Sequence, residues 1–179
     1  DSKPIREMIV IDGVDSQDYW GDPLTRDKHM ASNIIDTYAS NKSKTIVWGH
    51  NVHIAKDTTM AKVPGMGFYL KEKFGKNFYA VAFDTYKGAV NVLSNGNFEA
   101  HAFEGKEKTF SNTFAQAKFD TFFLSFNKKT NPFIGTTNFI TNIYSHWQEP
   151  TPLPIRPGLD FDALVFIRET SPSIRLTKD

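Results

Sequence analysis

The strongest constraint on the fold comes from short runs of consecutive apolar residues that alternate with segments of helical periodicity. Residues 161–167 (Phe-Asp-Ala-Leu-Val-Phe-Ile) are rich in β-branched and aromatic side chains, which is typical of a strand buried on both faces. Residues 44–49 form a second run of this kind, and residues 26–41, which precede it, carry apolar side chains at helical spacing. This alternation predicts an α/β fold with a mixed, largely parallel sheet flanked by helices.

Turn-forming residues divide the rest of the chain into further short elements. The motif Asn95-Gly96-Asn97 predicts a β-hairpin, and Gly88 predicts a turn before its first strand. The other predicted elements are strands at 78–84, 89–93, 98–103 and 121–126 and helices at 65–74 and 109–117. Residues 127–154 are rich in Asn, Thr and Pro and predict a long loop or lid, whereas residues 5–20 are compatible with a strand or a helix.

Length and composition indicate a single globular domain and exclude several classes of function. The chain has 179 residues and a formal net charge of +1, which gives nucleic acids and acidic membranes no strong electrostatic attraction to it. The absence of cysteine excludes disulfides, thiolate metal ligands and cysteine nucleophiles, and it fits a reducing compartment, so we expect a cytoplasmic protein. No apolar run approaches the roughly 20 residues of a membrane span.

Two histidines follow the apolar run at 44–49. In open α/β sheets functional groups collect beyond the carboxyl ends of strands, and His50 and His53 stand at such a position. Two imidazoles three residues apart can converge on one point, where they suit proton transfer or metal binding. The alternative is a polar turn whose histidines bond only to the backbone. A catalytic zinc commonly takes three protein ligands and this loop offers two, so a divalent metal is an option rather than a requirement.

Other polar residues give weaker signals. Arg26 and Asp27 open the predicted helix at 26–41, where an arginine could stabilise an oxyanion, although an ordinary first-turn charge pair explains the same residues. The tripeptide Gly65-Met66-Gly67 before a helix is compatible with phosphate binding, but more simply with a tight turn. No Gly-x-Ser-x-Gly motif is present, so the sequence shows no serine nucleophile.

Two of these segments together resemble motifs of the erythromycin esterase family. Arg26-Asp27-Lys28-His29-Met30-Ala31-Ser32-Asn33-Ile34 is similar to its Arg-Asp-x-x-Met-Ala-x-Asn helix start. Ile46-Val47-Trp48-Gly49-His50-Asn51-Val52-His53 is similar to its apolar strand ending in Gly-His-Asn-x-His. The match runs in order from about Arg26 to Ser171, and residues 100–157 carry little of it.

The resemblance implies a hydrolase that acts on carboxylic esters or opens macrolide lactones, an activity associated with antibiotic resistance. By matched position His50 and His53 are active-site histidines, and Arg26 is a charged residue of the cleft. In the family an amino-terminal half adds a histidine, viewed as the base that activates water, and a glutamate. Family members are longer, and this chain begins at Asp1 without an initiator methionine. We therefore expect residues 1–179 to be the carboxyl-terminal part of a single domain, which the missing half or a second chain completes.

The expected reaction is water attack on an ester or lactone carbonyl without a covalent intermediate or a required cofactor. A histidine base deprotonates the water, while His50 or His53, with Arg26, stabilises the oxyanion or protonates the leaving alkoxide. Aromatic residues of the 127–154 loop are expected to line the substrate pocket: Phe133, Tyr144 and Trp147. The alternatives are a haem- or metal-binding protein of the same superfamily, in which the two histidines are ligands, and a relative that has lost activity and serves a structural role.

Overall fold

A four-stranded mixed sheet lies at the centre of the computed structural model, which describes residues 25–41, 43–127 and 130–174. The strand order is β2-β1-β6-β3, with β1 (Val81–Ser94) parallel to β6 (Ala163–Thr170). The hairpin partner β2 (Asn97–Glu104) and the edge strand β3 (Thr121–Ser125) are antiparallel to their neighbours. The predicted mixed α/β sheet is confirmed, and one of these three pairings is parallel, fewer than the sequence predicts.

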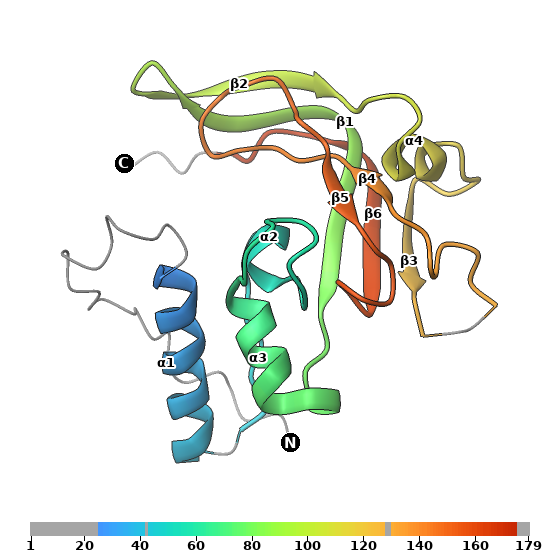
Figure 1. Cartoon of the computed structure of the whole chain (residues 1–179). Helices are drawn as coiled ribbons and strands as arrows, with labels where there is room; N and C mark the ends of the chain where they lie inside the picture. The colour runs from blue at the N-terminus through green and yellow to red at the C-terminus, as the bar shows by residue number, and fades with distance from the viewer. Residues whose placement is uncertain (1–24, 42, 128–129, 175–179) are drawn as a thin grey trace, which may run out of the picture.

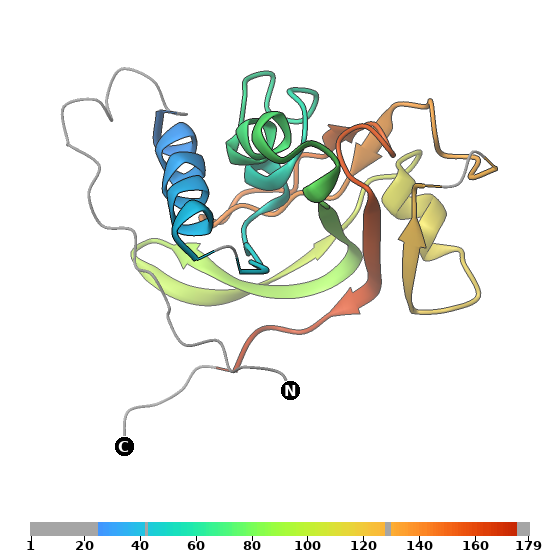
Figure 2. The same ribbon diagram turned by 90° about the horizontal axis from the view of Figure 1, so that it is seen from below.

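Three helices gather on one side of the sheet and a fourth lies at its far end (Figures 1 and 2). Helix α1 (Thr25–Asn41) packs against α3 (Met66–Phe74), and the single turn α2 (Asn51–Ile54) lies between α3 and the sheet. A short 3-10 turn, η2 (Gly75–Asn77), connects α3 to β1. Helix α4 (Phe110–Ala115) covers the end of the sheet near β3. These helices confirm the predicted segments at 26–41, 65–74 and 109–117, whereas residues 5–20 lie outside the described part.

The predicted loop at 127–154 is mostly irregular, but it contributes to a small second sheet. Strand β4 (Asn138–Ile140) pairs with β5 (Leu153–Ile155) in antiparallel register. Ile140 and Ile155 are buried there, and both belong to the main hydrophobic core. The loop is therefore anchored to the body of the domain by two apolar side chains.

Aromatic side chains fill the core between α4 and the sheet. Phe114 packs edge-to-face on Phe122, Phe133 and Phe166, with ring centroids 5.2–6.1 Å apart. Such pairs contribute about 0.5–1.5 kcal/mol each beyond the area that they bury. Phenylalanine thus supplies much of the hydrophobic core at this end of the molecule.

The predicted strand at 44–49 is wrong in the described structure. Residues 43–50 have no regular secondary structure, and Ile46 and Trp48 are 86% and 81% exposed. A covered strand needs neighbouring strands and a second layer. Within the described residues, β1 has β6 on one side of residues 81–86, while β2 pairs on the other side only from Lys87 onward. The apolar run therefore lies beside an open sheet edge instead of inside a sheet.

The predicted turn at Gly88 is also wrong, because β1 continues through it as one strand of 14 residues. Gly88 has a φ of +136°, and a Cβ at this position would lie 2.0 Å from the carbonyl oxygen of Thr170 on β6. Glycine is required here by the close approach of two strands. The hairpin signal is confirmed, since Asn95 and Gly96 have φ values of 48° and 82° in the β1–β2 turn.

Candidate active site

The histidine motif forms a single helical turn that is fixed to the sheet. His50 is the N-cap of α2, and its Nδ1 accepts a hydrogen bond of 3.4 Å from the backbone N–H of Val52. Asn51 pairs with the backbone of Phe83 on β1: its Nδ2 donates to the carbonyl at 2.7 Å, and its Oδ1 accepts from the N–H at 3.0 Å. The amide side chain thus takes the place of a neighbouring strand at the open edge of β1.

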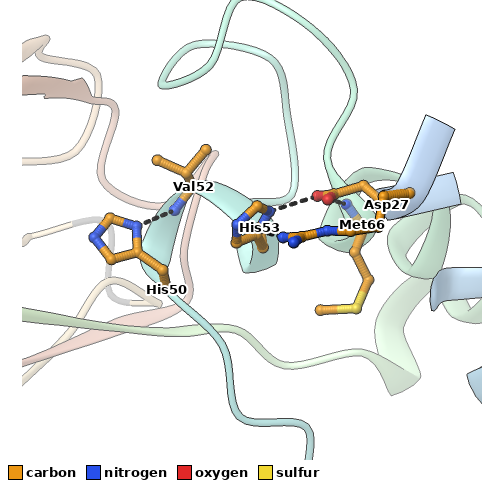
Figure 3. A network of polar contacts seen from close by, with 6 residues as sticks. Asp27, His50, Val52, His53 and Met66 are labelled. Atoms are coloured by element: carbon orange, nitrogen blue, oxygen red, sulfur yellow. Dashed lines mark hydrogen bonds and ion pairs between the residues drawn. The ribbon is translucent and has the colours of Figure 1, made fainter. Parts of the chain in front are cut away.

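The ring of His53 points toward Asp27, in the first turn of α1 (Figure 3). Its Nδ1 lies 2.8 Å from Oδ2 of Asp27, and its Nε2 lies 3.3 Å from a terminal nitrogen of Arg26. The side chain of His53 is 26% exposed, whereas that of Asp27 is fully buried. The two ring nitrogens are therefore held by adjacent residues of a helix that lies 26 and 27 positions earlier in the chain.

These contacts fix the tautomer of His53. A carboxylate only accepts hydrogen bonds and a guanidinium only donates them. Nδ1 must therefore carry the proton that is donated to Asp27, and Nε2 must present its lone pair to Arg26. A carboxylate behind one nitrogen and a basic second nitrogen is the arrangement that supports proton transfer by histidine.

Asp27 connects the histidine turn to two helices. Besides the ring of His53, its Oδ2 accepts the backbone N–H of Met66 at 3.0 Å, at the start of α3. Burial alone would raise the pKa of Asp27, but the hydrogen bonds from His53 and Met66 and the positive charge of Arg26 outweigh it and hold that pKa below its ordinary value. Asp27 is thus a buried, charged residue that connects α1 to α2 and α3, and not an exposed first-turn residue.

Two glycines at the start of α3, its N-cap Gly65 and its second residue Gly67, allow the close packing that Asp27 requires. A Cβ on Gly67 would lie 2.2 Å from the carbonyl oxygen of Ile54, and one on Gly65 would lie 2.8 Å from that of Val52. The backbone of α3 therefore rests directly on α2. The glycine pair serves the contact between the two helices, which agrees with the simpler of the two sequence interpretations.

His50 and His53 do not converge on one point as the spacing predicts. In Figure 3 the two rings lie on either side of the α2 turn, and each has its own partners. Desolvation and the nearby charge of His53 lower the pKa of His50, while a hydrogen bond to the backbone of Ile143 partly raises it. His53 therefore acts electrostatically on His50, but the two residues present two separate imidazoles.

The predicted substrate-binding aromatics occupy three different places. Phe133 packs on Phe110 and Phe114 in the core, with ring centroids 5.2 Å apart in both pairs. Trp147 stacks on His101 at 4.3 Å, next to the β1–β2 hairpin. Tyr144 is 37% exposed and follows Ile143, a residue whose backbone affects the pKa of His50. The contact of these three side chains with substrate stays a prediction.

A large apolar cavity borders the site on the side of α1 and α3. Its volume is about 710 Å³, and Gly49 and Ile54, which flank the histidine turn, belong to its lining together with Leu70 and Phe83. A volume of this size is within the range of small-molecule sites. The cavity lies beside the open edge of β1.

In the part of the chain that the structure describes, no group of three or more His, Asp or Glu side chains is arranged to hold a metal ion. None of the described helices combines the length and hydrophobicity that crossing a bilayer requires.

The sequence did not predict the role of Asp27 in the site. Its position in the first turn of a helix indicated a simple charge pair. The contact with His53 depends on how α1 packs against α3, which the sequence does not show. The one signal in the sequence is the Arg-Asp pair of the helix-start motif.

Comparison with known proteins places these residues in a wider context. The chain is 38% identical over 74 residues to the putative hydrolase YbfO of Bacillus subtilis, an alignment that covers 36% of this chain and 16% of the relative. A solved structure of a Bacillus cereus protein aligns with 29% identity and a TM-score of 0.74, over 84% of this chain and 39% of that one.

Two more distant structures share the fold. A succinoglycan biosynthesis protein aligns with 22% identity and a TM-score of 0.71, over 81% of this chain and 38% of its own. A mutant of the erythromycin esterase EreC in its open conformation aligns with 16% identity and a TM-score of 0.61, over 83% of this chain and 38% of its own. The chain thus spans less than two fifths of the solved chains that it matches.

The family assignment comes from a model that matches almost the whole chain. The erythromycin esterase family model covers residues 6–170, which include both histidine-site motifs and every strand of the central sheet. The chain belongs to the erythromycin esterase family.

Proposed function

We propose that the protein is a hydrolase of carboxylic esters, including macrolide lactones, and that His53 is the central imidazole of its active site. The observation that carries this proposal is the Asp27–His53–Arg26 array, in which one nitrogen is held by a buried carboxylate and the other by a permanent positive charge. Membership of the erythromycin esterase family and similarity to a putative hydrolase support the same reaction class.

The array can perform both proton transfers of ester hydrolysis. When a substrate carbonyl oxygen binds Arg26, the guanidinium leaves Nε2 of His53. Nε2 is then free to accept a proton from water. The water oxygen bonds to the carbonyl carbon, and Arg26 stabilises the negative charge that develops on the carbonyl oxygen. As the ester C–O bond breaks, the proton on Nε2 passes to the leaving alkoxide, and a carboxylic acid and an alcohol result.

Asp27 and His50 complete the roles that this chain supplies. Asp27 keeps Nδ1 protonated and stabilises the imidazolium that forms during water attack, as a buried carboxylate does when it orients a catalytic histidine. His50 offers a second imidazole on the other side of the α2 turn, where it can bind a substrate oxygen. No cofactor enters this reaction.

The remaining groups of the active site are proposed to come from outside this chain. The chain spans 38–39% of the solved relatives, and an apolar cavity of about 710 Å³ lies open beside its histidine turn. A further segment of the same protein or a second chain that packs on this side would shield the site from bulk water and enclose a large apolar substrate.

The direct test is ester turnover by the full-length gene product. Hydrolysis of a p-nitrophenyl ester and of erythromycin is measured for the native protein and for His53→Gln and Asp27→Asn. Loss of a positioned acid–base group costs about 10²–10⁴-fold in kcat, and we expect both variants to lose activity in that range. His146→Gln is the matched control, because His146 is exposed and belongs to a different segment.

Full activity of His53→Gln, with circular dichroism showing an intact fold, would remove His53 from the mechanism. Native protein that binds neither ester nor lactone, but takes up haem or a divalent metal in stoichiometric amount, would instead favour a binding protein.

A further inference from the structure

The chain leaves the histidine turn through a lysine that is buried. Lys56 lies two residues after Ile54, the last residue of α2, and it is 8% exposed. Its Nζ donates to Oδ1 of Asp162 at 2.7 Å, and its backbone N–H donates to the carbonyl of Asp160 at 2.9 Å. Lysine is almost never buried unless it is paired. Both the side chain and the backbone of Lys56 are therefore bound to the segment that precedes β6.

Asp162 connects this lysine to the central sheet. It immediately precedes β6, and its Oδ2 accepts the backbone N–H of Ala80, which immediately precedes β1, at 2.8 Å. The backbone N–H of Asp162 donates to the carbonyl of Ala80, also at 2.8 Å. Strands β1 and β6 then pair from Val81 and Ala163 onward. Lys56 is therefore attached to the point where the two parallel strands begin.

The other end of the turn is held on the same strand. Asn51, the first residue of α2, forms two hydrogen bonds with the backbone of Phe83 on β1. Phe83 lies three residues beyond Ala80, which corresponds to about 10 Å along an extended strand. The turn therefore runs opposite to the direction of β1, and it is anchored both before and after His53.

Backbone hydrogen bonds make residues 50–55 one unit between these two anchors. Three bonds of 2.9–3.3 Å run from the N–H groups of residues 53–55 to the carbonyls of His50 and Asn51. An isolated helix of this length is not stable in water. The orientation of the turn is therefore determined by the contacts that hold it to the rest of the protein.

The ion pair between Lys56 and Asp162 gives direction rather than stability alone. The Lys56 side chain is 6% exposed and that of Asp162 is 26% exposed. Removing such charges from water offsets most of their attraction, and apolar residues of similar volume often stabilise a fold as well. The pair, however, bonds Oδ1 to Nζ of Lys56 and Oδ2 to the N–H of Ala80. These two bonds define where the turn lies against the sheet, which an apolar contact would not.

We propose that Lys56 and Asp162 are positioning residues, which hold the α2 turn at its end so that the ring of His53 meets Asp27. The inference rests on the proposed function, because that function makes the orientation of His53 matter. Without the ion pair the turn keeps its anchor at Asn51 and can pivot about it. Hydrogen bonds weaken steeply with distance and angle, so a small rotation separates Nδ1 of His53 from the carboxylate, which lies 2.8 Å away in the native chain.

The test is ¹⁵N NMR of the His53 ring in the chain of 179 residues, with its signals assigned by a His53→Gln variant. Lys56→Met keeps an unbranched side chain of similar size and removes its charge. A hydrogen bond to a carboxylate favours one tautomer by about tenfold, so the ratio of Nδ1–H to Nε2–H in neutral His53 should fall by that factor. Arg168→Met is the matched control, because it removes the cation of a different ion pair, with Asp120, and should leave the ratio unchanged.

A double variant separates positioning from a general loss of stability. Lys56→Met alone leaves the carboxylate of Asp162 without its cation, so the thermal midpoint should fall. Lys56→Met combined with Asp162→Asn leaves no unpaired charge and keeps an oxygen for the N–H of Ala80, so the midpoint should recover. The tautomer ratio of His53 should stay low, because no ion pair holds the turn. If Lys56→Met does not fold, the double variant carries the test alone.

A native tautomer ratio in folded Lys56→Met and in the double variant would overturn the inference. So would a ratio that recovers together with the thermal midpoint, because the ion pair would then act on the fold alone. A native chain in which His53 lacks the Nδ1–H form would overturn both this inference and the proposed function. Absence of ester turnover by the full-length gene product would count against the proposed function alone, because the NMR measurement needs no substrate.

Discussion

At the residue scale, the carboxylate of Asp27 joins three segments of the chain through one oxygen. It accepts the ring N–H of His53 at 2.8 Å and the backbone N–H of Met66 at 3.0 Å, from a fully buried position on α1. Hydrogen bonds to a charged group are stronger than neutral ones, and leaving their partners unsatisfied in the interior is costly. Orientation of His53 and attachment of α3 therefore depend on the same atom.

Replacement of Asp27 by asparagine should destabilise the fold as well as the site. The neutral amide lacks the charge that strengthens both hydrogen bonds, and the expected loss in unfolding free energy is about 1–3 kcal/mol, measured by urea denaturation. Asp36→Asn, on an exposed position of the same helix, should change stability by less than about 0.5 kcal/mol. Equal stability of the two variants would show that the carboxylate of Asp27 makes no contribution to the fold.

Asp84, which is buried on β1, should lower the unfolding free energy of the chain as pH rises, whereas an ordinary ion-paired carboxylate raises it. Its pKa is raised to about 7 in the folded state, so between its ordinary value of 3.8 and about 7 the folded state holds a proton that the unfolded state has released. Its contribution is fully present below the unfolded pKa and is lost as pH rises through that interval, at ~1.4 kcal/mol per unit. Asp84→Asn should therefore gain stability relative to the native chain between pH 4 and pH 7.5 in urea titrations. A constant difference across that range would contradict the assignment.

At the scale of elements, local sequence patterns predicted most helices and turns but not the contacts between them. Helix α1 and the Asn95-Gly96 turn follow from spacing and turn chemistry, and both are present. The turn predicted at Gly88 is wrong, because glycine is required there by the close approach of Thr170 on β6, and that approach is a tertiary contact that the local sequence does not reveal. The run at 44–49 has strand composition, yet composition does not name a pairing partner, and within the described residues none is there.

The candidate site shows the same division. The spacing of His50 and His53 identified the candidate turn, while the orientation of each ring depends on its own contact, to Val52 N–H for His50 and to Asp27 on α1 for His53. The role of Asp27 could be read only from the packing of α1 on α3. The sequence therefore identified the histidines of the candidate site, and the packing of the helices determined which ring nitrogen of each histidine faces which partner.

The α2–α3 contact is the element-scale feature most open to a simple test. Gly67→Ala would place a Cβ 2.2 Å from the carbonyl oxygen of Ile54, so α3 must move away from the histidine turn. Overpacking of this kind costs about 1–3 kcal/mol, and we expect a lower thermal midpoint together with loss of the His53–Asp27 hydrogen bond. Glu72→Ala, on an exposed position of the same helix, should do neither. A Gly67→Ala variant as stable as Glu72→Ala would mean that the backbones are not in contact.

At the scale of the whole molecule, the described chain packs much of its core near α4 and leaves part of β1 without a neighbouring strand. The phenylalanine cluster packs on the sheet beside α4, whereas Ile46 and Trp48 lie exposed beside the cavity and the unpaired part of β1. Trp48 contacts Phe83 at 5.1 Å between ring centroids, so the exposed aromatics form a continuous patch. Patches of this kind mark association surfaces, and solved relatives have more than twice the length of this chain.

Removal of this patch should affect association and leave folding unchanged. An Ile46→Ser and Trp48→Ser double variant should change the unfolding free energy of the chain by less than about 0.5 kcal/mol, because both side chains are exposed. It should also reduce self-association in sedimentation velocity experiments. Leu70→Ala, which truncates a buried residue of the same cavity, should instead cost about 2–5 kcal/mol. Strong destabilisation by the double variant would show that these side chains are covered in solution.

The tautomer of His53, read from its ring nitrogen shifts in ¹⁵N NMR spectra, tests the arrangement of the site most directly. A carboxylate on one side and a guanidinium on the other allow one neutral form, so we expect a proton on Nδ1 and a bare Nε2. In Asp27→Asn this preference should weaken, while the spectrum of His146 stays the same. A native chain in which neutral His53 carries its proton on Nε2 would contradict the array from which the proposed hydrolysis follows.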